Sequence, residues 1–341
     1  MELRISSIPI MLEYLSETGA EPANRAALQK IFDHEDYQFE ARRYGLSSVE
    51  PLISYFSHLK NVEGKDIPDL SKERKSALRD KHNLWLDCAS NPQKYYTRYE
   101  KVKHILCENN IQNLQHKLSA AFPDGAAIND SSIIVTLSFG PSFGYVYENA
   151  LHLDLFGIED ICTIEELPYI ILHEMHHLQV QKLIGSYHSF TRKFSLLDNY
   201  IFRFSGEGLA IKFCNNAEGV ISKRIENHLN ANIGIPAMAI LNNHFEEHFN
   251  LFNDTIKRIK QNSITASEIE EQFRSYWWNP QLYKDETAFL TQTPIYSFGN
   301  EIFGCIFDAF GMEILFECFY NPARVIGYFN KTNCGYIISD T

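Results

Sequence analysis

The chain has 341 residues, of which 45% are hydrophobic, and it carries 31 basic and 43 acidic residues. This composition predicts a folded globular protein with one large core or two cooperating lobes. The formal net charge of -12 and the lack of a Lys/Arg cluster argue against a nucleic-acid partner, because such a surface repels a phosphate backbone.

The sequence also indicates where the protein acts. It has no uncharged apolar run of about 18 residues, and its opening lacks the apolar segment and cleavage site of a signal peptide. We therefore expect neither a membrane partner nor secretion. The seven cysteines are odd in number, dispersed, and form no C-x-x-C pair, which is typical of reduced thiols. These features predict a cytoplasmic protein.

The first 120 or so residues are typical of successive helices. Apolar residues recur at three- and four-residue intervals, between polar residues, Pro or Gly, in the segments 23–45, 48–62, 71–91 and 92–118. We predict a helical N-terminal lobe over residues 1–128.

The character of the chain changes over residues 132–155, where β-branched and aromatic residues are interrupted by Gly, Pro and Asn. This pattern predicts two or three short strands in a small antiparallel sheet. From Thr163 the helical period returns and continues to about Asn330. The order of elements predicts an α+β protein that is predominantly α-helical, with a second domain over residues 129–341.

The stretch IILHEMHHL, residues 170–178, contains the pattern H-E-x-x-H, which begins at His173 and ends at His177. Four residues advance an α-helix by about 400° and about 6 Å, so these two imidazoles lie on nearly the same face and can share a metal ion. Glu174 lies about 100° from His173 and can reach a metal-bound water as a general base. The apolar flanks predict burial, and buried histidines need a strong partner such as zinc.

A catalytic zinc site takes three protein ligands and keeps a fourth position for water. The best candidate for the third ligand is Glu207, in the later segment FRFSGEGLAIKF. Gly206 and Gly208 have no side chains, so this segment is expected to approach the metal-bearing helix closely. We predict one Zn²⁺ per chain, bound by His173, His177 and Glu207.

With these two motifs the chain resembles the gluzincin zinc metallopeptidases, in which H-E-x-x-H is followed by a glutamate ligand. It is most similar to uncharacterised zinc-dependent peptidases with E-G-x-A as the second motif, here residues 207–210. The resemblance covers roughly residues 130–330. It implies a zincin-like fold in which an edge strand could pair with an extended peptide. Tyr296 resembles in position the tyrosine that follows the metal motifs, and is the first candidate for the oxyanion donor, with His152 and Tyr147 as alternatives.

The predicted function is therefore a zinc-dependent metallopeptidase that acts on a peptide or protein. Zinc lowers the pKa of its water, Glu174 takes the proton as this water attacks a peptide carbonyl, and Glu174 then delivers it to the leaving amine. A second hypothesis is a zinc-binding, peptidase-like protein without turnover, because Ile211 stands where related enzymes often carry an acidic residue. A third is a metal-free helical interaction protein.

A second histidine pair occurs in the inverted pattern H-x-x-E-H, which runs from His244 to His248. Its surroundings alternate apolar residues with Asn, Glu, Lys and Arg. This alternation predicts a half-solvated amphipathic helix rather than a metal site.

The surroundings of the predicted zinc site leave alternatives open. A zinc-bound imidazole donates its other N–H to a carboxylate or carbonyl, and Asp154, Asp198 and backbone carbonyls are all candidates. His176 is expected to be a neighbour of the site or partly exposed, since the pair four residues apart already accounts for the metal.

Overall fold

The computed structural model describes residues 1–17, 24–63, 66–68, 77–123, 131–140, 142–185, 187–226, 235–283 and 292–339. The predicted domain boundary near residue 128 lies outside these residues. The chain forms two compact units. Unit 1 comprises Met1–Gln115 and Ile128–Glu174, and unit 2 comprises His116–Ala127 and Met175–Thr341.

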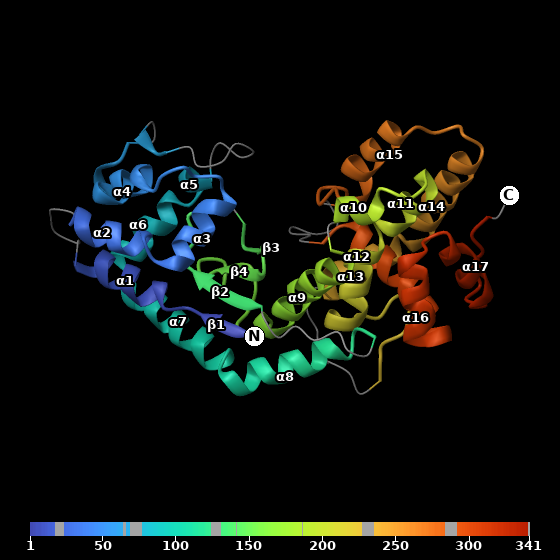
Figure 1. The fold of residues 1–341 in the computed structure, drawn as a ribbon, viewed down its shortest axis with the longest axis horizontal. Helices are drawn as coiled ribbons and strands as arrows, with labels where there is room; N and C mark the ends of the chain where they lie inside the picture. Colours follow the sequence, from blue (N-terminus) through green and yellow to red (C-terminus); the bar gives the residue numbers. More distant parts are fainter. Residues whose placement is uncertain are drawn as a thin grey trace. The chain divides into compact units, whose positions relative to one another are not determined.

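Unit 1 contains a four-stranded sheet with the order β1-β2-β4-β3 (Figure 1). The strands are β1 (Glu2–Arg4), β2 (Ser132–Thr136), β3 (Gly144–Tyr147) and β4 (Ala150–Asp154). β1 pairs with β2 and β2 with β4 in parallel, and only the β3–β4 pair is antiparallel. Two or three strands were predicted over residues 132–155, and the structure has three there. The sheet is mixed, so the prediction of an antiparallel sheet is wrong. Residue alternation carries no information on strand direction.

The two central strands are the buried part of the sheet. All five residues of β4 are buried, as are the last four of β2. In β2 this burial matches the continuous apolar run Ile133–Val135, as expected for a strand covered on both faces, whereas β4 also buries the polar residues His152 and Asp154. Phe39, from a helix packed on the sheet, contacts Ile134 of β2 and Ala150 of β4, which fixes these strands against the helices of unit 1.

Helices of unit 1 lie beside this sheet (Figure 1). The predicted segment 23–45 is divided in two at His34, whose extended backbone and ring nitrogen cap the second helix. The helices that begin in unit 1 before the sheet are α1 (Ser7–Glu17), α2 (Arg25–Phe32), α3 (Glu35–Arg43), α4 (Glu50–Ser57), α5 (Ala77–Asp80), α6 (His82–Ser90), α7 (Pro92–Ile105) and α8 (Glu108–Ser119), with the short 3-10 helix η2 (Leu59–Asn61).

Unit 2 is helical in its described residues, as predicted for the chain after Thr163. Its first long helix, α9, begins in unit 1, has Pro168 in its first turn, and continues across the boundary between the units. The helices are α9 (Leu167–Ile184), α10 (Tyr187–Thr191), α11 (Leu196–Phe202), α12 (Ser205–Ala210), α13 (Ile235–Asn243), α14 (Phe245–Lys260), α15 (Ala266–Gln272), α16 (Pro294–Tyr320) and α17 (Arg324–Lys331), with the π-helices η4 (Ile211–Asn215) and η5 (Phe273–Trp277).

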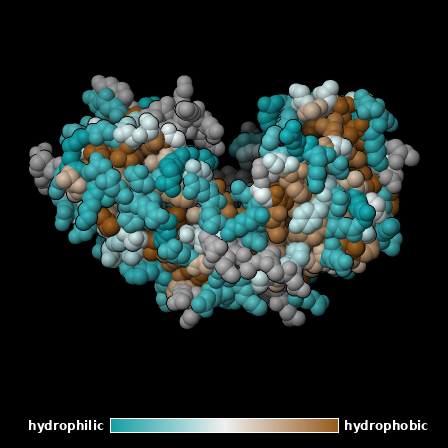
Figure 2. Space-filling view, in the orientation of Figure 1, coloured by the Kyte–Doolittle hydropathy of each residue, from teal (hydrophilic) through white to brown (hydrophobic). Residues whose placement is uncertain are grey.

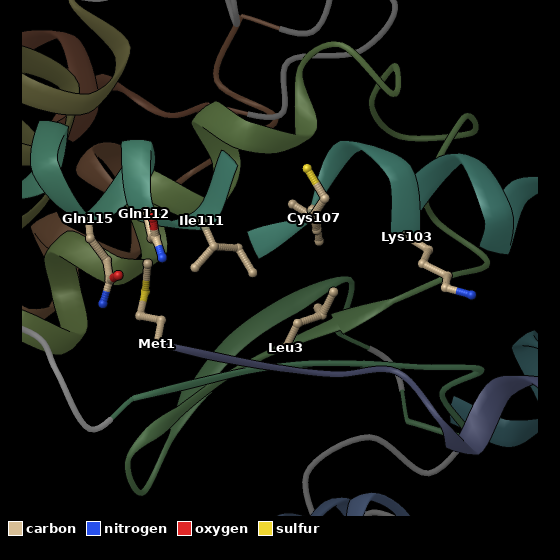
Figure 3. Close-up of a pocket in the computed structure, with 8 residues that line it drawn as sticks. Met1, Leu3, Lys103, Cys107, Ile111, Gln112 and Gln115 are labelled. Carbon is tan, nitrogen blue, oxygen red and sulfur yellow. The ribbon is translucent and has the colours of Figure 1, made fainter. Parts of the chain in front are cut away.

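The face drawn in Figure 2 is largely hydrophilic, with smaller hydrophobic areas on both units. Among the described helices, none has the length and apolar character that a membrane span requires. A cavity of about 500 Å³ lies beside β1, where Met1 and Leu3 face Ile111 and Gln112 of α8 (Figure 3). Its lining contains none of the predicted site residues.

Candidate metal centre

Two helices bring the three predicted zinc ligands together. His173 and His177 lie one turn apart on α9, and Glu207 lies on α12. One possible ligand atom from each residue lies within 4.8 Å of the other two. The His177 Nε2 atom is 3.3 Å from Glu207 Oε2. A tetrahedral zinc with bonds of about 2.0 to 2.1 Å separates two ligand atoms by about 3.4 Å, so this pair already has the spacing that a shared ion requires.

The three side chains are only partly shielded from solvent. His173 is 8% exposed, and the side chains of His177 and Glu207 are 26% and 15% exposed. Glu174, next in sequence to the first ligand, is half-buried. A structural zinc site is closed by four protein ligands, whereas a catalytic one keeps a position open. A buried His173, the partly exposed His177 and Glu207, and an adjacent carboxylate fit the second arrangement.

The helix that carries Glu207 packs very closely on α16. A Cβ atom on Gly208 would lie 2.3 Å from the backbone carbon of Gly299, and one on Gly299 would lie 2.3 Å from the Phe204 carbonyl oxygen. Only glycine fits at either position. The segment approaches α9 as predicted, but the glycines are not the reason: Gly208 serves the contact with α16, and a Cβ on Gly206 would meet nothing within 4 Å.

A buried lysine fixes the turn that follows α12. Lys212, in η4, has no exposed surface, and its Nζ donates to Asp308 Oδ1 of α16 at 2.6 Å and to Ser222 Oγ at 3.2 Å. Burial lowers the pKa of Lys212, and the bond with Asp308 opposes this shift. The backbone N–H of Lys223 donates to the other oxygen of Asp308 at 2.7 Å. The end of the Glu207-bearing segment is thus tied to α16.

A second carboxylate of α16 holds the loop beyond η4. Glu301 accepts hydrogen bonds from three consecutive backbone N–H groups, those of Val220, Ile221 and Ser222, the last two at 2.9 Å. Burial raises the pKa of Glu301, although these hydrogen bonds oppose the shift. A Cβ on Gly219 would lie 2.4 Å from the carboxylate. Two acidic residues of α16 therefore fix residues 219–223, which we call the clamped loop.

Comparison with protein families agrees with this geometry. Residues 28–332 match the model of the family described as "Putative zinc dependent peptidase (DUF5700)". The chain belongs to this family. No curated protein and no solved structure matches this chain. The family match spans both the H-E-x-x-H helix and the segment with Glu207.

His176 lies between the two predicted ligands of α9 in this family member and has a packing role. His176 has no exposed surface. Its ring stacks on Phe122, with 4.8 Å between centroids, and lies nearly parallel to Phe213 of η4 at 6.5 Å. The expectation of partial exposure is wrong, because aromatic rings on both sides enclose the imidazole. His176 contributes to the packing of α9 against η4.

The two aspartates considered as partners of the zinc-binding imidazoles are bound elsewhere. Asp154 accepts from Lys81 Nζ at 2.5 Å and from the Ser138 and Phe156 backbone N–H groups at 3.0 and 3.1 Å. Asp198 forms a capping box with Ser195 at the start of α11. Asp154 therefore belongs to a buried ion pair and Asp198 to a helix cap, and residue type alone could not predict these partners.

The alternative oxyanion donors both lie in unit 1, His152 in its core and Tyr147 half-buried on the edge strand β3. His152 is 1% exposed and is stacked between the rings of Phe39 and Tyr145, whose centroids are 4.9 and 5.0 Å away. Tyr147 packs on the cluster that contains Phe39. His152 is therefore enclosed by rings, and aromatic stacking rather than contact with a substrate explains it.

Tyr296 lies in the first turn of α16, one turn before Gly299. Its ring packs against the cluster of Ile211, Ala217 and Met238 and meets Trp278 edge-on at 6.2 Å. It is therefore held beside η4, the direct continuation of α12. Its role as oxyanion donor stays a prediction.

The second histidine pair has different partners. His248, on α14, has no exposed surface, and its Nε2 is 3.1 Å from the Tyr283 hydroxyl. The His244 ring stacks on Tyr283 at 3.8 Å, and its Nδ1 is 3.4 Å from Glu247 Oε2. Burial lowers the pKa of His248 to about 3. The prediction of an amphipathic, half-solvated helix is confirmed for α14, and His248 lies on its buried face. Among the described residues, ligand atoms of His, Cys, Asp and Glu converge in a group of three only at His173, His177 and Glu207.

Proposed function

We propose that the protein is a zinc-dependent metallopeptidase of the gluzincin type. The observation that carries this proposal is the convergence of the H-E-x-x-H histidines with Glu207, in which His177 Nε2 and Glu207 Oε2 are 3.3 Å apart. Two imidazole nitrogens and one carboxylate oxygen form the protein ligand set of thermolysin-type catalytic zinc. Membership of a family described as zinc dependent peptidases supports the same assignment.

Each residue around this site has a separate role in the proposed hydrolysis. A zinc ion held there would lower the pKa of a bound water and polarise the substrate carbonyl. Glu174 is the general base: its carboxylate accepts the proton of the attacking water and passes it to the leaving nitrogen as the amide bond breaks. Tyr296 is the proposed donor to the oxyanion, because it is held beside η4, which continues directly from the Glu207-bearing helix.

Among the described residues β3 is the last strand of the sheet, and its outer edge is a suitable place for an extended peptide. The Phe143 carbonyl accepts from the Asp154 backbone N–H at 2.8 Å. In antiparallel pairing the next residues that bond to β4 are Tyr145 and Tyr147, so Gly144 directs its backbone N–H and C=O away from β4. We propose that a substrate adds here as a strand, with main-chain hydrogen bonds giving affinity.

The decisive experiment is the Glu174→Gln substitution, with cleavage of a mixed peptide library followed by mass spectrometry. Glutamine keeps the size of the side chain and cannot take a proton, so we expect bound zinc to remain at about one per chain while cleavage falls by about 10²- to 10⁴-fold. Full activity in Glu174→Gln would refute the proposed base. Glu247→Gln, on the second motif, is the matched control and should cleave like the wild type.

One observation favours a second candidate function. Ile211, four residues after Glu207, is fully buried in an apolar cluster with Ala217 and Met238, so this position offers no carboxylate to support the ligands. A zinc-binding, peptidase-like protein without turnover would bind about one zinc per chain and cleave no member of the library. Cleavage by the wild type removes this candidate.

A further inference from the structure

A cavity of about 450 Å³ in unit 2 is bordered by basic side chains from two helices. Lys260 is the last residue of α14, and Arg324 and Lys331 are the first and last residues of α17. Among the described residues that line the cavity, none is acidic. The chain as a whole has a formal net charge of -12, so three cations around one cavity differ clearly from its average composition. A ligand that enters this cavity meets a positive surface.

One face of α17 contributes most of this positive surface. Arg324, Gly327 and Lys331 follow one another at intervals of three and four residues, which places them in one row along the helix. Glycine weakens a helix relative to alanine. Neither a positive φ angle nor a close neighbour requires a glycine at position 327, since a Cβ atom there would meet nothing within 4 Å. Its missing side chain leaves the space between the two cations open, so that a ligand can approach the backbone.

The contacts of the three cations hold them at the cavity. The Lys260 Nζ atom donates to the Ser339 carbonyl at 3.3 Å. Arg324 forms an ion pair with Glu317 of α16, which uses part of a guanidinium that has five N–H donors. The Lys331 Nζ atom lies over the Tyr328 ring, 5.4 Å from its centroid. Lys331 is exposed and forms no ion pair with the described residues, so its charge is available to a ligand.

The rest of the lining is mainly apolar and adjoins the charged row. Leu197 of α11 is half-buried, and Ile326 of α17 is 4% exposed. The Tyr328 side chain adds an aromatic ring. The volume of the cavity lies within the range of about 300 to 1,000 Å³ that is typical of small-molecule sites. This lining fits a molecule that has a compact anionic group and a short apolar body.

We propose that this cavity binds a small phosphomonoester. Such a phosphate group carries a charge of about -1.5 to -2 at pH 7 and has three strong acceptor oxygens, so it can accept hydrogen bonds from Lys260, Arg324 and Lys331. A carboxylate brings a single charge and two oxygens, and it matches three cations less well. The apolar body of the ester lies against Leu197 and Ile326. The proposal does not depend on the protein being a peptidase, because none of these residues belongs to the candidate metal centre.

The test titrates phenyl phosphate into the full-length protein and follows binding by isothermal titration calorimetry. We expect one site per chain with a Kd of about 1 mM or lower, and weaker binding of inorganic phosphate, which lacks the apolar ring. In Lys331→Gln the affinity for phenyl phosphate should fall about 10-fold, because one charge-assisted hydrogen bond is lost. Gly327→Leu should abolish binding, since its side chain fills the space between the cations. Leucine is the better helix former of the two, and far-UV circular dichroism checks that this variant is folded.

Two controls show where the probe binds. Lys257→Gln makes the same change of charge at an exposed lysine in the last turn of α14 that does not line the cavity, and it should bind phenyl phosphate like the wild type. An equal loss in Lys257→Gln and Lys331→Gln would overturn the proposal, because general attraction would then explain binding. A loss in His173→Ala would also overturn it, by placing the probe at the metal centre. So would the absence of binding to the wild type at about 10 mM phenyl phosphate.

Discussion

The helix α9 and the N-terminal end of α14, where His244 is the N-cap residue, carry related histidine patterns and have different surroundings. Each places two histidines four residues apart with a glutamate close by. On α9 the pair converges with a carboxylate from α12. On α14 one histidine is bonded to the Tyr283 hydroxyl and the other is stacked on the Tyr283 ring. Spacing along a helix supplies the pair, and the element packed opposite decides whether a metal can be shared.

The largest expected effect separates the two pairs by zinc content. His173→Ala or Glu207→Ala removes one of three ligands, so we expect zinc in chelator-washed protein to fall from about one per chain to near zero. The double substitution His244→Ala/His248→Ala should leave zinc unchanged. Elemental analysis measures both, and zinc lost only from the double variant would move the site to α14.

The second prediction concerns what positions Glu207. In Gly208→Ala the new methyl group meets the backbone of Gly299, which cannot retreat like a side chain, so we expect a loss of about 3 kcal/mol in the free energy of unfolding and weaker zinc binding. Gly206→Ala is the matched control, because nothing lies within 4 Å of its Cβ position, and it should change stability by less than about 1 kcal/mol. Urea unfolding measures the free energy of unfolding of both variants. Equal values would show that the close contact between Gly208 and Gly299 does not determine stability.

The third prediction uses the buried histidine of α14. The pKa of His248 falls from about 6.5 in the unfolded chain to about 3 in the folded protein. Its neutral ring is fully compatible with folding above pH 6.5, and stability is lost as pH falls towards 3, because the unfolded chain takes up a proton that the folded protein excludes. Between pH 7 and 5 we expect about 2 kcal/mol of loss from this residue.

The control for this pH effect is His248→Gln, which has no charge to gain. Urea unfolding of both proteins at pH 7 and 5 isolates the contribution of the residue, since other titrating groups act on both. The wild type should lose about 2 kcal/mol more than the variant over this range. An equal loss in both proteins would show that the ring is protonated in the folded state.

Much of the fold followed from local patterns, and what was missed depended on distant partners. Periodicity located the strands of residues 132–155 and the helices on either side. It could not reveal β1, because three residues at the start of the chain carry no period, and β1 exists through its parallel pairing with Ser132–Ile134 of β2.

The candidate site shows the same limit. The three candidate ligands could be predicted because helical spacing and a glycine-flanked glutamate are local signals, and the structure brings these residues together. The partner of Asp154 is Lys81, 73 residues away, and Gly208 meets Gly299 on a helix that is distant in sequence. The contacts by which Lys212 and Glu301 hold the segment after α12 correspond to no sequence motif either. A buried lysine and glutamate in otherwise apolar helical segments were the available signal.

The clamped loop has a consequence for the dynamics of unit 2. It contains neither helix nor strand, and loops of this kind normally exchange their amide hydrogens with solvent within seconds to minutes. Here three consecutive amides are bound by the buried Glu301 carboxylate and a fourth by Asp308. These amides can exchange only when the loop leaves α16. The amides of residues 220–223 should therefore be protected from hydrogen–deuterium exchange as strongly as those in the helix core. The part of this unit that opens most slowly should include a loop.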